Sequence, residues 1–282
     1  MPHLRWCLVA GVIAALAVCP AGAALADALT TSPAAAERKP AVSSVTVSGV
    51  SEARAALIAE HAEQVRRSAF DLLLGDAEPR PWVPRCAIHI HATPAAFTAA
   101  VGGPPAASRG ATSLEFSGDR VASRRIDVMG DGPGAIPDAL AHELVHVVLA
   151  DRFTEAAPPR WADEGIALLF DDVAKQAGHE ADFRSAHARG LAYAAGDLLA
   201  LEEYPGDVRR QRVFYGQSAA LVRWLVDRRD PATFIRFVAD LQAGDPGTAF
   251  ERHYDLDMAA VFDSAWKEVR PIHSLSFNST EN

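Results

Sequence analysis

The chain has 282 residues, enough to bury one sizeable hydrophobic core or two small ones. Hydrophobic residues make up 49% of it and charged residues 22%, which excludes wholesale disorder. The formal net charge of −9, with no stripe rich in Lys and Arg, excludes a nucleic-acid-binding protein. A local basic cluster of Arg209, Arg210 and Arg212 is interpreted as a solvated surface, with a site for a substrate carboxylate as the alternative.

Residues 1–26 have the pattern of a bacterial export signal. A weakly basic start precedes an apolar stretch from Trp6 to Val18, and Ala24-Leu25-Ala26 fits the cleavage pattern. We therefore expect a signal peptide over 1–26, a flexible lead-in over 27–41 and export to the periplasm, the cell envelope or the medium. The segment Leu16-Ala17-Val18-Cys19 also resembles a lipoprotein box, so membrane attachment through a lipidated Cys19 is the alternative.

Residues 42–150 are predicted to form a lobe that contains strands. Ser51 and Gly75 mark the ends of its first long helix. Cys86 begins an apolar strand and is expected to be a buried, inert thiol. The expected strands are 42–50, 86–91, 111–116 and 120–128, and the expected helices are 52–74, 94–101 and 136–150.

Residues 151–270 are predicted to form a helical lobe, followed by a polar tail over 271–282. The expected helices are 160–171, 180–194, 215–227, 231–243 and 258–270. Strands before about residue 150 and helices after it predict an α+β fold.

The helix predicted over 136–150 carries the sequence His142-Glu143-Leu144-Val145-His146. Residues four apart lie on one face of a helix, so His142 and His146 would project side by side, as two nitrogen ligands of one Zn²⁺ must. Glu143, one step round the helix, can reach a metal-bound water as a general base.

A third ligand is expected because catalytic zinc sites usually have three protein ligands and one open position. Glu164 lies in the first turns of the next predicted helix, 18 positions after His146. Two packed helices joined by a short turn can bring it to the metal. Asp163 is its nearest competitor as a ligand.

The pattern His142-Glu143-x-x-His146, followed by Trp161-x-x-Glu164-Gly165-x-Ala167, resembles the gluzincin clan of zinc metallopeptidases. In detail it is most similar to the bacterial envelope proteins called peptidase MA-like. The resemblance runs from about Arg120 to Val269 and includes Tyr215-Gly216-Gln217-Ser218-Ala219 and the segment from Ala249-Phe250 to Trp266. It implies a zincin-like fold, with a small mixed sheet and the active-site helix in the N-terminal lobe. One Zn²⁺ per chain would be bound by His142, His146 and Glu164 between that lobe and a mainly helical C-terminal lobe.

The resemblance also implies a peptidase that acts on a peptide or protein substrate. Glu143 would be the base and acid, and Tyr215 would donate to the oxyanion. The strand 120–128 is expected to pair with an extended substrate. The Gly-x-Met-Glu-Asn element of the aminopeptidases is missing, since Met129 is followed by Gly130 and Asp131. This departure argues against an exopeptidase. The alternative function is a zinc-bound but non-peptidolytic module that binds peptide or supports an envelope assembly.

Structural roles are the alternatives for these site residues. His142 and His146 would then be helix histidines satisfied by neighbours, and Glu164 a carboxylate favoured by the helix dipole. Tyr215 would be a core tyrosine. Trp161 is expected to pack its helix against the core. Ordinary roles are expected for four further histidines, with His89 and His91 in a strand and His179 and His187 at the surface.

Overall fold

The computed structural model describes residues 43–75, 79–102, 108–132, 134–258 and 261, together with the backbone of residues 5–8. Most of the predicted signal peptide, including Cys19, the lead-in and the tail therefore lie outside the described residues. The same holds for most of the helix expected over 258–270. No helix within the described ranges is long and apolar enough to cross a membrane.

The described strands form one mixed sheet in the order β1-β4-β5-β3-β2. Its members are β1 (Arg5–Leu8), β2 (Val45–Ser48), β3 (Cys86–His91), β4 (Gly110–Ser117) and β5 (Arg120–Met129). β2, β3 and β5 are parallel, whereas β4 is antiparallel to both β5 and β1. The expectation that β5 pairs with a substrate is wrong, because β3 and β4 already occupy both of its edges.

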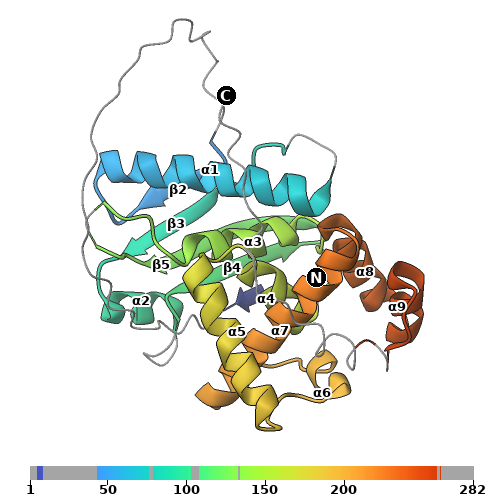
Figure 1. The fold of residues 1–282 in the computed structure, drawn as a ribbon. Helices are drawn as coiled ribbons and strands as arrows, with labels where there is room; N and C mark the ends of the chain where they lie inside the picture. The colour runs from blue at the N-terminus through green and yellow to red at the C-terminus, as the bar shows by residue number, and fades with distance from the viewer. Residues whose placement is uncertain are drawn as a thin grey trace, which may run out of the picture.

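Helices cover both faces of this sheet. Ile88 and Ile126 belong to the main core, which α1 (Glu52–Leu74) and α3 (Leu140–Ala150) complete on one face (Figure 1). On the other face, α2 (Pro94–Val101) places Phe97 against Ala111 and Met129. Because successive strand residues point to opposite faces, alternating apolar positions supply both layers.

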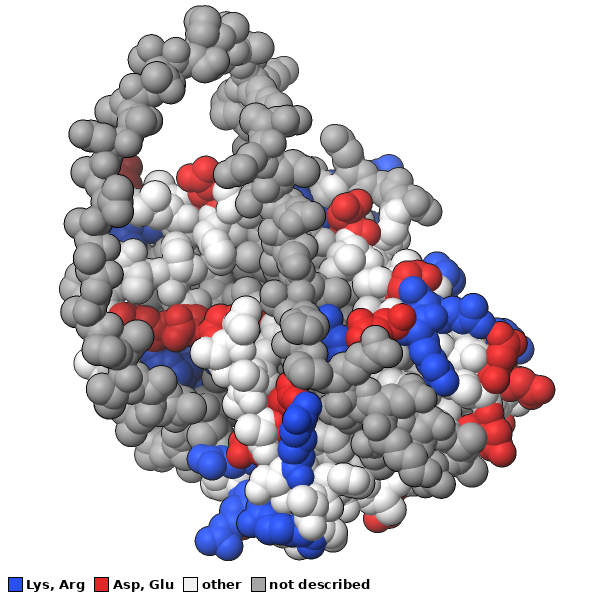
Figure 2. All heavy atoms as spheres, viewed as in Figure 1, with Lys and Arg blue, Asp and Glu red and all other residues white. Residues whose placement is uncertain are grey.

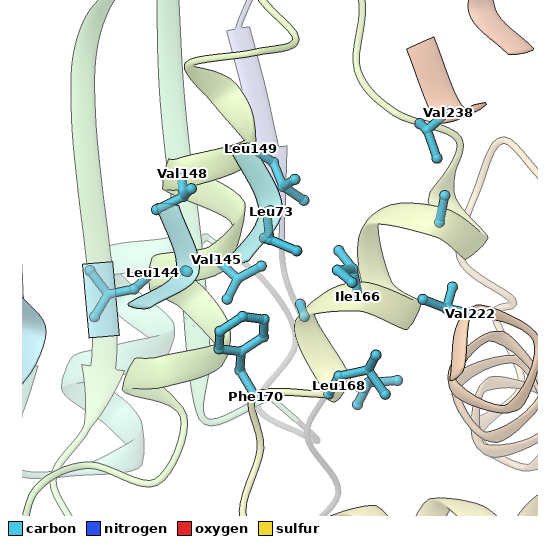
Figure 3. Close-up of a cluster of buried hydrophobic side chains, with 14 of the residues drawn as sticks. Leu73, Leu144, Val145, Val148, Leu149, Ile166, Leu168, Phe170, Val222 and Val238 are labelled. Carbon is cyan, nitrogen blue, oxygen red and sulfur yellow. The ribbon is translucent and has the colours of Figure 1, made fainter. Parts of the chain in front are cut away.

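The chain after residue 150 is helical wherever it forms regular structure among the described residues, which is compatible with the predicted α+β class. The helices are α4 (Arg160–Leu168), α5 (Val173–Ala188), α6 (Ala195–Leu199), α7 (Val208–Arg228), α8 (Pro231–Ala243) and α9 (Pro246–Tyr254). Apolar side chains fill the space where α3 meets α4, among them Val145 and Ile166 (Figure 3). One core therefore joins the sheet lobe to the helices.

Several predicted boundaries are confirmed and others are corrected. The predicted helices 52–74, 94–101 and 231–243 have the expected ends. The strand expected over 42–50 is limited to Val45–Ser48. The helix expected from residue 136 begins at Leu140, since Pro137 disfavours helical backbone at the residue before it. The helix expected over 160–171 ends at Leu168.

Two later helices begin earlier than predicted because aspartates cap them. Asp172 accepts a hydrogen bond from the Lys175 backbone N–H, so α5 begins at Val173 rather than at residue 180. It ends at Ala188, two residues before Gly190, which has a φ of 66°. Asp207 caps α7 in the same way, so α7 begins at Val208, seven residues before the predicted start at Tyr215. The short helices α6 and α9 were not predicted.

The basic cluster of Arg209, Arg210 and Arg212, predicted to be a solvated surface, lies in the first turns of α7. Arg209 and Arg212 are exposed, and Arg210 donates a hydrogen bond to the Leu191 carbonyl. Figure 2 shows Lys and Arg atoms gathered near the lower ends of α5 and α7, beside scattered acidic groups. This arrangement agrees with a solvated basic patch.

α7 packs very closely against α4 and α5, and a glycine makes each contact possible. A Cβ on Gly165 would lie 2.4 Å from Val222 Cγ2 and 2.7 Å from the Ser218 carbonyl oxygen. A Cβ on Gly216 would lie 2.3 Å from the His179 carbonyl oxygen. These distances are too short for any side chain. Gly165, the residue after Glu164, therefore allows α4 to pack close to α7.

Gly165→Ala is expected to lower the free energy of unfolding by about 1–3 kcal/mol, because the added methyl group overpacks the contact between α4 and α7. Gly178→Ala is the matched control, since a Cβ there meets no described atom within 4 Å and alanine favours a helix. Chemical denaturation of both variants measures the effect. Equal stability of the two variants would contradict the close packing.

Candidate metal centre

Three predicted ligands from two helices meet in the interior. His142 and His146 lie one turn apart on α3, with ring centroids 4.9 Å apart. Glu164 comes from α4, and one potential ligand atom from each of the three residues lies within 4.8 Å of the others. All three side chains are buried, with at most 1% of their surface exposed. The geometry thus brings together the residues that sequence spacing selected.

The polar atoms at the centre of this cluster are suited to a metal ion. Nε2 of His142, Nε2 of His146 and Oε2 of Glu164 are buried without a hydrogen-bond partner among the described residues. His142 Nε2 lies 3.3 Å from Glu164 Oε2. Buried polar atoms are normally paired, and two imidazoles with one carboxylate form a common donor set for catalytic zinc. The residues present therefore fit Zn²⁺.

Two aspartates face the outer nitrogens of the histidines. His146 Nδ1 lies 2.9 Å from Asp163 Oδ1, within hydrogen-bond distance, and His142 Nδ1 lies 3.5 Å from Asp171 Oδ2. A carboxylate behind a metal-binding histidine fixes its orientation and increases its basicity. Asp163 thus contacts the nitrogen of His146 that is farther from the cluster centre and is not a competing ligand. Asp171, seven residues after Glu164, carried no signal in the sequence.

The electrostatics of the centre favour a cation. Burial alone would lower the pKa of His142, but the charges of Asp171 and Glu164 raise it well above its usual value. Burial would raise the pKa of Glu164, but the two histidines and Tyr204 lower it to about 2. Four carboxylates surround two imidazoles here, namely those of Glu143, Asp163, Glu164 and Asp171. A buried excess of negative charge is costly, and a divalent cation would compensate it.

Of the two carboxylate oxygens of Glu143, one has a hydrogen-bond partner among the described residues and the other has none. Thr112 of β4 contacts Glu143 Oε2 at 2.6 Å, whereas Oε1 is buried and unpaired among the described residues. Burial raises the pKa of Glu143 to about 7, the range in which a carboxylate accepts and returns a proton near neutral pH. Thr112 was not predicted, because it lies 31 residues earlier on a strand.

For the zinc-dependent peptide hydrolysis predicted from the sequence, Thr112→Val is expected to lower kcat by about 10- to 100-fold with unchanged zinc content. The substitution keeps the side-chain shape but removes a hydrogen bond to a charged group, which typically contributes about 1.5–3 kcal/mol. Steady-state kinetics and metal analysis check the result. Thr112→Ser, which keeps the hydroxyl, should retain most of the activity. Wild-type kcat in the valine variant would show that this contact does not position Glu143.

One tyrosine, Tyr204, contacts a candidate ligand, and a second, Tyr215, lies beside Tyr204. Tyr215, predicted to donate to an oxyanion, is buried in the middle of α7, with its ring centroid 6.3 Å from that of Tyr204. Its catalytic role stays a prediction. Tyr204, which sequence reasoning missed, directly contacts Glu164 Oε1 through its hydroxyl. Burial, followed by the Glu164 charge, raises the pKa of the Tyr204 phenol well above its usual value, so the phenol keeps its proton and donates.

The remaining predicted residues have structural environments. His89 Nδ1 contacts Ser48 Oγ at 2.8 Å, and His91 Nε2 contacts Asp127 at 2.7 Å. His187 is exposed as expected, but the surface position expected for His179 is wrong. His179 is buried, and its ring centroid lies 6.1 Å from that of Tyr215 on α7.

Two core predictions are confirmed. Trp161 is 1% exposed and packs against Phe234 and Phe237 of α8, so it fixes α4 to the core as predicted. The thiol of Cys86 is fully buried, and this burial raises its pKa to about 12. Such a thiol is not a nucleophile at neutral pH.

Comparisons with known proteins add no functional assignment. No protein-family model matches the chain, and no curated protein matches its sequence.

Proposed function

We propose that the protein is a zinc-dependent peptidase of the gluzincin type, with a zincin-like arrangement of sheet and active-site helix. One observation carries the proposal. Ligand atoms of His142, His146 and Glu164 converge, all three buried and without a hydrogen-bond partner in the described part of the chain, and Glu143, the residue next to His142, has an Oε1 in the same state. The predicted export signal would direct the enzyme out of the cytoplasm.

Bound zinc would acidify a water molecule and polarise the carbonyl of the scissile peptide bond. His142, His146 and Glu164 would hold the ion, while Asp163 and Asp171 keep the histidine rings oriented. Glu143 Oε1 would take a proton from the attacking water and deliver it to the leaving amine. Thr112 restrains the other oxygen and so keeps Oε1 available.

A second candidate is a zinc-bound module that does not cleave peptides. The observation that favours it is burial, because His142, Glu143, His146 and Glu164 are each only 0–1% exposed. A closed centre suits a structural metal, whereas a hydrolase needs a path for its substrate. Zinc binding is common to both functions, and only hydrolysis separates them.

A peptide-library digest tests the proposed function. Full-length protein is loaded with zinc, depleted with a chelator and then reloaded, and the products are identified by mass spectrometry in each state. We expect cleavage in both zinc-loaded states and none in the depleted state. A zinc-loaded protein that cleaves no peptide would instead support the non-peptidolytic module.

A further inference from the structure

Tyr204 contacts the candidate metal centre but belongs to none of the motifs identified in the sequence. It lies between α6 and α7, 40 residues after Glu164. The Arg160 side chain stacks over its ring at 4.8 Å, and the Phe214 ring meets it edge-on with centroids 6.2 Å apart. Contacts from α4 and α7 therefore fix the ring, and with it the direction of the hydroxyl.

The two carboxylate oxygens of Glu164 have different environments. Oε1 accepts the hydrogen bond from Tyr204. Oε2 is 3.3 Å from His142 Nε2 and has no hydrogen-bond partner among the residues that the structure describes. Within the described part of the chain, Oε2 is therefore the Glu164 oxygen without a hydrogen bond, and it is the one beside His142.

The difference matters because a carboxylate can ligate a metal through one oxygen or through two. With two imidazoles, a single carboxylate oxygen leaves the fourth position of a tetrahedral ion open for water or substrate. Binding through both oxygens would fill that position or raise the coordination number.

We propose that Tyr204 is a positioning residue that restrains Glu164 Oε1, so that Glu164 offers a metal ion only Oε2. The proposal rests on the proposed function in one respect, since it assumes that His142, His146 and Glu164 bind zinc. It predicts that the Tyr204 hydroxyl, and not merely its ring, controls metal affinity and coordination number.

Tyr204→Phe in the full-length chain tests this proposal, because phenylalanine keeps the ring packing and removes only the hydroxyl. Zinc affinity is measured by competition with a chromophoric chelator at fixed pH, and coordination by the visible absorption of the cobalt-substituted protein. We expect the zinc Kd to rise by about 10- to 100-fold. We also expect weaker cobalt absorption, because four-coordinate Co²⁺ absorbs more strongly than five- or six-coordinate Co²⁺.

Tyr254→Phe is the matched control, since the Tyr254 hydroxyl is buried in α9 without a described hydrogen-bond partner. It should keep wild-type affinity and absorption. A double-mutant cycle with Glu164→Gln shows whether Tyr204 acts through Glu164. If it does, Tyr204→Phe has no further effect on zinc affinity in the Glu164→Gln background.

The outcomes distinguish a failure of the proposed function from a failure of the role proposed for Tyr204. A wild-type protein that binds neither zinc nor cobalt would overturn the proposed function itself. A wild type that binds both metals, with a Tyr204→Phe variant of equal affinity and absorption, would overturn the role of Tyr204 alone. Equal losses in the wild-type and Glu164→Gln backgrounds would also overturn it, because the tyrosine would then act independently of Glu164.

Discussion

Glu143→Gln is expected to reduce peptide hydrolysis by about 10²- to 10⁴-fold while zinc stays bound. The amide has nearly the same shape as the carboxylate but cannot accept the proton of the attacking water. Thr112 can still donate a hydrogen bond to the amide oxygen, so the side chain keeps its position. The loss should therefore fall on kcat and not on the zinc content.

Paired assays check this expectation. Initial rates on a peptide found in the library digest are compared at equal zinc occupancy for wild type, Glu143→Gln and Glu60→Gln. Glu60 is an exposed residue of α1, so its variant should retain the wild-type rate. If Glu143→Gln cleaves as fast as the wild type, Glu143 is not the base.

His142→Ala is expected to abolish zinc binding and the stabilisation that zinc provides. It removes one of three ligands, and it leaves Glu164 Oε2 and Asp171 buried beside an empty volume. A ligand that binds only the folded state at roughly 1,000 times its Kd stabilises that state by about 4.1 kcal/mol. In a domain of this size such a gain raises Tm by on the order of 10 °C.

Thermal unfolding with and without added zinc gives the comparison. The wild type should show the zinc-dependent rise in Tm, and His142→Ala should not. His187→Ala, which removes an exposed histidine of α5, should behave as the wild type does. A zinc-dependent rise that survives in His142→Ala would place the ion elsewhere.

Local signals in the sequence predicted much of the fold. Gly75, which the sequence marks as the end of the first long helix, closes α1 with a left-handed φ of 84°. Where such a signal stands next to apolar residues at helical spacing, the predicted end of the helix is confirmed. α5 and α7 begin too late in the prediction because their capping aspartates, Asp172 and Asp207, lie in polar stretches without apolar period.

The sequence predicted only those residues of the candidate centre that share one helix or lie close together along the chain. His142, Glu143 and His146 share α3, and Glu164 lies in the next helix. The partners of these residues come from distant parts of the chain, with Thr112 on β4, Asp171 after α4 and Tyr204 before α7. Only tertiary packing brings them together, and no periodicity encodes it.

Local sequence patterns likewise did not predict the order of the strands in the sheet. β5 has the alternation of a half-buried strand, and its position just before the segment His142-Glu143-x-x-His146 suggested a free edge. Pairing with β3, more than 30 residues earlier, gives β5 a central position instead.

The metal content of the full-length protein tests the central claim most directly. The protein is purified in buffer with a trace of zinc, dialysed against metal-free buffer and analysed by native mass spectrometry and elemental analysis. We predict one zinc ion per chain in the wild type and none in His142→Ala. A wild-type chain that retains no zinc under these conditions would contradict the account.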